Sequence, residues 1–288
     1  MKRFDYFEPT SLKEAAALLS RYPGKANLLA GGTDLLVEIK EQIRAPDYVI
    51  SVQRIPGMNG FSFDAKEGLR IGALVTTREL EINPVVQRHY PGLLQALREL
   101  GSIQVRNRAT LAGNICRASP SADTLPPLIA DGASVRIYGE RGERTVALED
   151  FFTGPGKTML APNELLTEIL VPAPAPHTGK CYIKHGRRKA MELATVGVAV
   201  CLTLEGAACV EVRISLGAVA PTPIRARQAE ALIRGKILDE KSIDAAAQTA
   251  MSESRPISNV RGSADYRKEM VRVLTRRAIE EARRKASA

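Results

Sequence analysis

The feature that most constrains the fold is a pair of glycines near the N-terminus, placed between a predicted strand and a predicted helix. The apolar segment NLLAG ends at Gly31, Gly32 follows, and DLLVEIKEQI then carries apolar residues at helical spacing. A second strand, DYVISV, is expected at residues 47–52. Strand, glycine turn, helix and strand in this order are typical of a small α/β unit, which we place in residues 1–55.

This glycine turn is a candidate phosphate site. Glycine lets the backbone approach a ligand closely, and the first N–H groups of a helix have no partner inside the helix, so they favour an anion. Thr33 adds a hydroxyl donor. The alternative is a plain strand-to-helix turn that Thr33 or Asp34 caps. The turn is not a GxGxxG motif and no Walker lysine follows it, so both common nucleotide fingerprints are absent.

Residues 56–174 are expected to form a second unit. They contain the strand candidates LRIGALVT and LLTEILV, a helix over 91–104 and a hairpin around RIYGERGERTV. Between these elements, residues 105–123 are rich in Asn, Ser, Arg and Gly without a regular apolar period, which predicts a long polar loop. Long loops inside compact domains are usually functional.

The last third of the chain predicts a separate, smaller domain. The proline-rich segment PAPAPHTGK (172–180) is the best candidate for a linker. Strand candidates follow it, and helices are expected at 239–252 and 263–286. We therefore expect a C-terminal α+β domain in residues 178–288.

A second glycine-bearing motif lies in the polar segment. In TLAGN, Ala112 and Gly113 permit a close backbone approach, while Thr110 and Asn114 supply hydrogen-bonding side chains. Asp123, nine residues further on, offers a carboxylate to the hydroxyls of a sugar or a ribityl chain. The alternative is a loop held by its own turns. Two such motifs on different units predict one elongated ligand, such as a dinucleotide, held across an interface.

The distribution of charge limits the kinds of partner that the chain is expected to bind. Lys and Arg number 41 against 32 Asp and Glu, a net charge of +9, and much of the excess lies in the last predicted helix, where glutamates are interleaved. We interpret this segment as the solvated face of an amphipathic helix, and contact with an acidic partner subunit is the alternative. Nucleic acid is not expected, because no aromatic platform or zinc pattern accompanies the charge.

The cysteines and the N-terminus indicate the compartment. Cys116, Cys181, Cys201 and Cys209 form no CxxC pair, so we expect no metal or iron–sulfur site on this chain and free thiols in a reducing compartment. The segment MKRFDYFEPT lacks the apolar stretch of a signal peptide, and no run is long enough to cross a bilayer. A cytoplasmic protein without a membrane span is the expectation.

Four segments together resemble a known family. AGGTDLL, RNRATLAGN, ASPSADTLPPL and YIKHGRR occur in an order and spacing similar to those of the medium, FAD-binding subunits of molybdenum hydroxylases, which include xanthine and carbon monoxide dehydrogenases. The resemblance extends over nearly all of the chain. It implies an α+β protein with a vanillyl-alcohol-oxidase-type FAD-binding fold, in which FAD lies between two α/β subdomains and a smaller C-terminal α+β domain follows.

The resemblance also implies the residues that contact FAD. The diphosphate would be wrapped by Leu28, Leu29, Ala30, Gly31, Gly32, Thr33, Asp34 and Leu35. The second cradle would comprise Thr110, Ala112, Gly113 and Asn114. Asp123 would bind the adenosine-side ribose or the ribityl chain, and the adenine or isoalloxazine would be lined by Leu100, Leu166 and Lys184. A cation at Lys184 would stabilise the anionic reduced flavin, whereas the alternative for this residue is an ordinary surface lysine.

The function that the resemblance implies is electron transfer. The molybdopterin cofactor would lie on a large partner subunit and the [2Fe-2S] clusters on a small one, and this FAD would pass electrons to an acceptor such as NAD or a quinone. No catalytic residue for substrate hydroxylation is expected on this chain. The other functions considered are a self-sufficient FAD oxidoreductase and a non-enzymatic binding protein.

One residue departs from the family pattern. Relatives often have TIGGN or TLGGN where this chain has TLAGN. Ala112 adds a methyl group at the point of close approach, so its φ is expected to stay negative.

Overall fold

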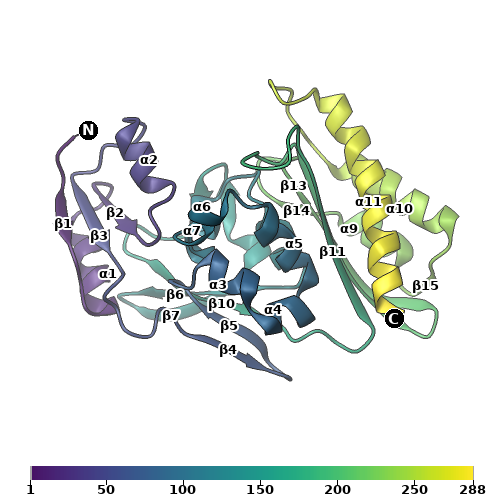
Figure 1. Cartoon of the computed structure of the whole chain (residues 1–288), viewed down its shortest axis with the longest axis horizontal. Coiled ribbons are helices and arrows are strands. Elements are labelled where there is room, and N and C mark those ends of the chain that lie inside the picture. The colour runs from purple at the N-terminus through teal and green to yellow at the C-terminus, as the bar shows by residue number, and fades with distance from the viewer. Residues whose placement is uncertain (1, 288) are drawn as a thin grey trace.

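Three parts follow one another in chain order along the molecule, as a computed structural model that describes residues 2–287 shows (Figure 1). The first part holds a parallel sheet in the order β1-β3-β2. Its elements are β1 (Asp5–Phe7), α1 (Leu12–Arg21), β2 (Ala26–Leu29), α2 (Leu35–Lys40) and β3 (Tyr48–Ser51). The predicted order of strand, glycine turn, helix and strand is therefore confirmed, with a helix α2 shorter than expected.

The second part is built on a five-stranded antiparallel sheet in the order β4-β5-β10-β6-β7. Its strands are β4 (Phe61–Asp64), β5 (Gly68–Gly72), β6 (Ser134–Gly139), β7 (Gly142–Ala147) and β10 (Leu165–Val171). The last strand, β10, returns to the centre of the sheet between β5 and β6. A single apolar core joins the first and second parts, because Ala15 and Ala16 of α1 belong to the same buried cluster as Ile71 and Ile169 of this sheet.

Six helices accompany this sheet: α3 (Thr77–Ile82), α4 (Pro84–His89), α5 (Pro91–Glu99), α6 (Ile103–Arg106), α7 (Leu111–Arg117) and α8 (Leu125–Ala130). A 3-10 turn (Leu148–Asp150) and the small hairpin of β8 (Phe152–Gly154) and β9 (Lys157–Thr158) complete the part.

The expectation of a long polar loop over 105–123 is wrong, since α6 and α7 occupy much of it. These helices have four and seven residues, so each offers too few turns for an apolar period to stand out. In α7 the period is present but minimal, because Leu111 and Ile115, one turn apart, are both fully buried.

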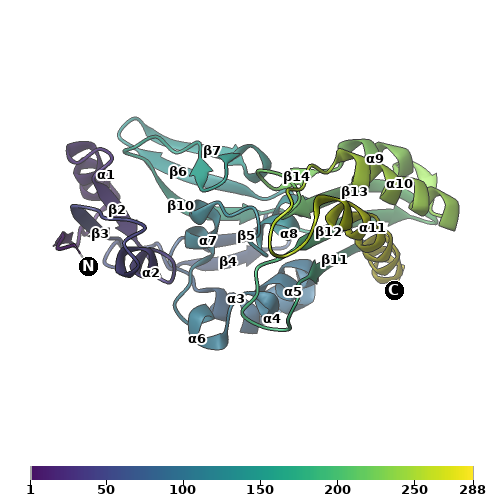
Figure 2. The same ribbon diagram turned by 90° about the horizontal axis from the view of Figure 1, so that it is seen from above.

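The third part is an antiparallel sheet covered by helices. Its strands are β11 (Thr178–His185), β12 (Val196–Glu205), β13 (Ala208–Gly217), β14 (Ile224–Arg225) and β15 (Lys236–Ile237). The helices are α9 (Arg227–Ile233), α10 (Glu240–Glu253) and α11 (Ala264–Ala286), and they lie at the end of the molecule away from the N-terminus (Figure 2). Both C-terminal helices are close to their predicted ranges.

Helix α11 accounts for much of the basic charge. Its buried residues, such as Leu274, Ala278 and Ala282, share one face. On the exposed side Arg272 and Arg284 pair with glutamates three residues earlier in the helix. The interpretation as a solvated amphipathic helix is therefore confirmed. Within residues 2–287, no helix is long and apolar enough to span a bilayer.

Candidate cofactor-binding site

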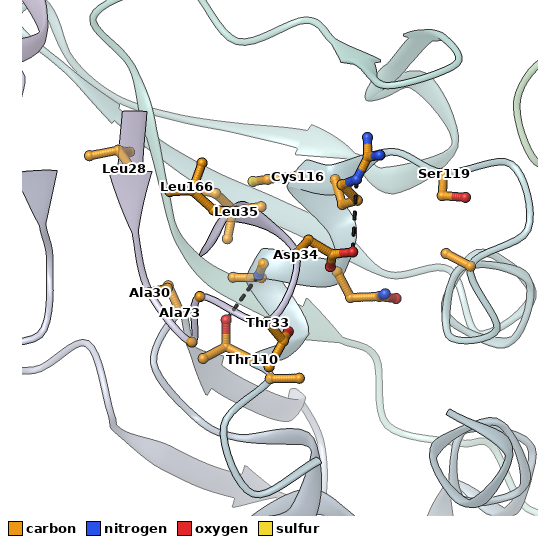
Figure 3. A pocket seen from close by; sticks show the side chains of 18 of the residues that line it. Leu28, Ala30, Thr33, Asp34, Leu35, Ala73, Thr110, Cys116, Ser119 and Leu166 are labelled. Atoms are coloured by element: carbon orange, nitrogen blue, oxygen red, sulfur yellow. Dashed lines mark hydrogen bonds and ion pairs between the residues drawn. The ribbon is translucent and has the colours of Figure 1, made fainter. Parts of the chain in front are cut away.

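A cavity of about 720 Å³ lies between the first and second parts. Its volume is in the range of small-molecule and cofactor sites. The loop before β12 also contributes to its lining, through Met191, Glu192 and Leu193. Of the sixteen residues that the sequence proposed, fourteen line this cavity, and Leu29 and Lys184 do not. Figure 3 shows that both glycine turns bring side chains here, among them Thr33 and Thr110.

The first turn presents free backbone donors. Across residues 2–287, no protein acceptor binds the amide N–H groups of the five consecutive residues 31–35. The amide of Leu36 is the first that is used, donating to the Gly32 carbonyl at 3.0 Å. Gly32 has φ +76°, which only glycine adopts without strain. The side chain of Asp34 makes no capping hydrogen bond, so the alternative of an Asp34-capped turn is wrong.

Gly31 has a packing role that the sequence did not suggest. A Cβ atom at this position would lie 2.0 Å from the carbonyl oxygen of Arg108. The absence of a side chain here therefore lets the backbone just before the second turn approach closely. Gly31 also lines the cavity. Gly31 packs the two turns against each other.

The second turn is the N-terminus of α7. Thr110 is its N-cap, and its Oγ1 accepts a hydrogen bond from the Gly113 amide at 3.0 Å. Asn114 Oδ1 accepts from the Thr124 hydroxyl at 2.6 Å. Ala112 lies within the helix and is not among the residues with positive φ, so the expectation for its backbone is confirmed. This turn is held mostly by its own side chains.

Asp123 lines the cavity with a carboxylate that the third part holds. Its Oδ1 accepts from the Tyr182 hydroxyl at 2.9 Å and its Oδ2 from the Lys184 ammonium at 2.8 Å. Burial, opposed by the Lys184 charge and these hydrogen bonds, raises the pKa of Asp123 to about 6. The carboxylate therefore titrates close to neutral pH.

Lys184 is not a surface lysine. Its side chain is 5% exposed, and besides Asp123 its ammonium donates to the backbone carbonyls of Glu99 at 3.2 Å and Glu192 at 2.7 Å. The lysine stands behind Asp123 and outside the cavity lining. Any direct contact with a cofactor stays a prediction.

An ion-pair bridge ties the two turns together on one side of the cavity. Arg117, at the end of α7, lies 3.9 Å from Asp34 and 2.7 Å from the buried carboxylate of Glu38 on α2. Arg44 also pairs with Glu38, at 2.6 Å. The helix that follows the first turn is thus anchored to the helix that begins at the second.

Apolar side chains make up much of the remaining wall, and the sequence motifs missed most of them. They include Met58, Ala73, Cys116, Leu160 and Leu193. No local pattern distinguishes them from core residues, since only the fold brings them together. Burial raises the pKa of the Cys116 thiol to about 12, so this cysteine is an apolar contact and not a nucleophile.

The ionisable groups of the lining are carboxylates, arginines and Cys116. No histidine lines the cavity, and no cluster of three or more potential metal ligands occurs among residues 2–287. The site can bind and orient a ligand that has an anionic part, a hydroxyl-bearing part and an apolar part.

Comparison with known proteins identifies the ligand. Residues 2–174 match the family model of the FAD binding domain in molybdopterin dehydrogenase, and residues 181–282 match the CO dehydrogenase flavoprotein C-terminal domain. The chain belongs to the FAD-binding subunits of the molybdopterin dehydrogenases. The predicted family, its oxidoreductase class and FAD as the cofactor are thereby confirmed.

Relatives of this FAD-binding subunit match it over nearly their whole length. The medium chain of carbon monoxide dehydrogenase from Hydrogenophaga pseudoflava is 36% identical, with 97% of each chain covered. A putative xanthine dehydrogenase FAD-binding subunit of Escherichia coli is 33% identical over 96% of this chain and 95% of the relative.

Solved structures agree with the fold. A chain of the H. pseudoflava carbon monoxide dehydrogenase superposes with a TM-score of 0.95 at 37% identity, covering 98% of both chains. A chain of quinoline 2-oxidoreductase from Pseudomonas putida gives 0.92 at 31% identity, with both chains fully covered. The predicted α+β fold with a FAD-binding part and a C-terminal domain is confirmed.

Proposed function

We propose that this subunit holds one FAD between its two glycine turns and relays electrons within a multi-subunit molybdenum hydroxylase. The observation that carries the proposal is the run of five free amide donors at residues 31–35, which lines a cavity closed by the turn at 110–114. Successive N–H groups without protein acceptors suit the diphosphate of a dinucleotide.

The other lining residues fit the rest of the cofactor. The Asp123 carboxylate suits the hydroxyls of a ribose or of the ribityl chain, because it accepts hydrogen bonds only. Leu28, Leu100 and Leu166 supply apolar contacts for a flat ring. The bound flavin supplies the redox chemistry, and the chain binds it, orients it and excludes water from it. Lys184, which stands behind Asp123, offsets the negative charge of that carboxylate.

The partners follow from the kind of relative that this chain resembles. Proteins described as medium chains and FAD-binding subunits match it along nearly its full length. We propose that a large subunit carries molybdopterin, that a small subunit carries [2Fe-2S] clusters, and that electrons reach an external acceptor such as NAD or a quinone. Substrate hydroxylation then takes place on the large subunit.

Two further parts of the proposal concern location and domain limits. The four cysteines are free thiols, which supports a cytoplasmic location. We place the subdomain boundary at residues 55/56 and the C-terminal domain at 178–288, after the segment that follows β10.

A pair of glycine variants tests the cofactor site. Gly32 and Gly57 both have positive φ, +76° and +81°, but only Gly32 lines the cavity. Replacing either by alanine costs about 1–2 kcal/mol of backbone strain. We expect Gly32→Ala to weaken FAD binding by about tenfold or more, because it displaces the free amides, while Gly57→Ala leaves the affinity unchanged.

The measurement is a titration of the full chain with FAD, followed by flavin absorbance and fluorescence. Saturation at one FAD per chain, weakened only in Gly32→Ala, supports the proposal. Equal affinity for both variants, or a wild-type chain that takes up no FAD at any concentration, contradicts it.

A further inference from the structure

One face of strand β11 connects the C-terminal part to the cofactor cavity. Side chains alternate along a strand, so residues 180, 182 and 184 share one face. Cys181 and Ile183, on the opposite face, belong to or pack on the C-terminal core. The face that carries 180, 182 and 184 therefore points toward the second part.

Each of these three side chains binds an aspartate of the second part. Lys184 and Tyr182 hold the two oxygens of Asp123, at 2.8 and 2.9 Å. Lys180 pairs with Asp131 at 2.9 Å, and its ammonium lies 4.2 Å from the centre of the Tyr90 ring. Lys180, Tyr182 and Lys184 are all almost fully buried, so the contacts are not screened by solvent.

The backbone of the strand is also attached. The Tyr182 amide donates to the Gln95 side-chain oxygen on α5 at 2.7 Å. The position of the Tyr182 ring is thus determined by both parts of the protein, and its hydroxyl reaches Asp123 from a fixed point.

We propose that Tyr182 is a positioning residue for FAD, which orients the Asp123 carboxylate toward the cavity so that docking of the C-terminal part completes the cofactor site. The inference rests on the proposed FAD site. Tyr182 itself does not line the cavity, so it acts through Asp123 and not by contact with the cofactor.

The chemistry of the carboxylate supports this role. An ionised carboxylate has about four acceptor positions, of which Tyr182 and Lys184 use two, and the others stay available to hydroxyl donors of the cofactor. The charged and titratable groups that face Asp123 are Lys184 and Tyr182 from β11 and Glu99 from the end of α5. Lys184 and Tyr182 favour the ionised form and Glu99 opposes it, so removing the tyrosine hydroxyl shifts the balance toward a protonated Asp123.

Lys180 provides a matched control on the same strand face. It is as buried as Tyr182 and also joins the two parts, but its partner Asp131 does not line the cavity. A variant at Lys180 disturbs the docking of the two parts without touching Asp123. A variant at Tyr182 that keeps the ring disturbs Asp123 while preserving the packing.

The experiment compares full-length wild type, Tyr182→Phe and Lys180→Met by FAD titration between about pH 5 and about pH 8. Wild-type affinity is expected to fall with decreasing pH, as Asp123 becomes protonated. Tyr182→Phe is expected to raise the Kd for FAD about tenfold near pH 7 and to move the midpoint of the pH profile upward by about one unit. Lys180→Met is expected to lower the Tm of the FAD-free chain while the midpoint stays at the wild-type value.

Several results would overturn the inference. One is a Tyr182→Phe chain with wild-type affinity and pH midpoint, and another is an equal loss of affinity in both variants without a shift of either midpoint. Should Tyr182→Phe unfold, Asp123→Asn takes its place, and persistence of the pH dependence in that chain contradicts the inference. A wild-type chain that binds no FAD refutes the proposed function itself, and is distinguished from these results by the wild-type titration.

Discussion

Each side of the cavity carries a glycine-containing turn, but the two turns are built differently. On the first side, residues 31–35 offer unpaired backbone amides, and the turn is shaped by Gly32 at φ +76°. On the second side, Thr110 caps α7, so the amide of Gly113 is already bound. We therefore expect FAD binding to depend on backbone geometry on the first side, and on side chains, including the titratable Asp123, on the second side.

Gly31 packs the two sides against each other, and its substitution is expected to have the largest effect on stability and on FAD binding. In Gly31→Ala the new Cβ would lie 2.0 Å from the Arg108 carbonyl oxygen, so the turns must separate. We expect a loss of roughly 4 kcal/mol in the free energy of unfolding and no measurable FAD binding. Chemical denaturation and FAD titration measure both quantities.

The control for this variant is Gly154→Ala, where the nearest atom to the new Cβ is 3.9 Å away. Its stability should stay close to that of the wild type. If Gly31→Ala were as stable as this control, the contact between the turns would not be needed.

The second prediction concerns the pH dependence of stability, which is expected to come from the second side of the cavity and not from the first. The pKa of Asp123 is about 6 in the folded chain against an ordinary 3.8, so the folded chain binds more protons between these values. The contribution of Asp123 to the stability of the FAD-free chain is therefore greatest below about pH 4. It decreases by roughly 3 kcal/mol as the pH rises through about 6.

Asp123→Asn lacks this titration. The difference in unfolding free energy between wild type and Asp123→Asn should follow the pH as described, and Gly32→Ala should keep the wild-type dependence, because backbone amides do not titrate. If the difference in unfolding free energy between the two chains stayed constant from about pH 4 to about pH 7, Asp123 would not be the titrating group.

The smallest expected effect concerns the cap on the second side. Thr110→Val keeps the shape of the side chain but leaves the Gly113 amide without its acceptor, which costs about 1 kcal/mol. FAD affinity is expected to fall only a few-fold, because the free amides of the first side are untouched. Thr110→Ser restores the hydroxyl and should recover both values. Complete loss of FAD binding in Thr110→Val would contradict the expectation that the free amides of the first side contribute most to FAD binding.

Much of the fold was predictable from local patterns. Long or strongly periodic elements, such as β10, α10 and α11, match their expected ranges closely. The helices α6 and α7 were missed because they are too short for a period of 3.6 residues to become visible. Their start signals, Ser102 and Thr110, were present in the sequence and act as N-caps.

The site was predictable where a motif marks it and not where only packing does. The glycine turns and Asp123 line the cavity as expected, but the contact of Gly31 with Arg108 joins residues far apart in sequence. The same holds for Tyr182, whose hydroxyl meets Asp123 59 positions earlier in the chain. No local pattern encodes such pairs, since they follow from how the parts dock.

The most direct test of the central claim is a crystal structure of the full chain saturated with FAD. We expect the diphosphate oxygens to lie within hydrogen-bonding distance of the amides of residues 31–35, with the Asp123 carboxylate facing a hydroxyl of the cofactor. A structure in which those amides face water while FAD binds elsewhere, or in which the cavity stays empty despite excess FAD, would contradict the account.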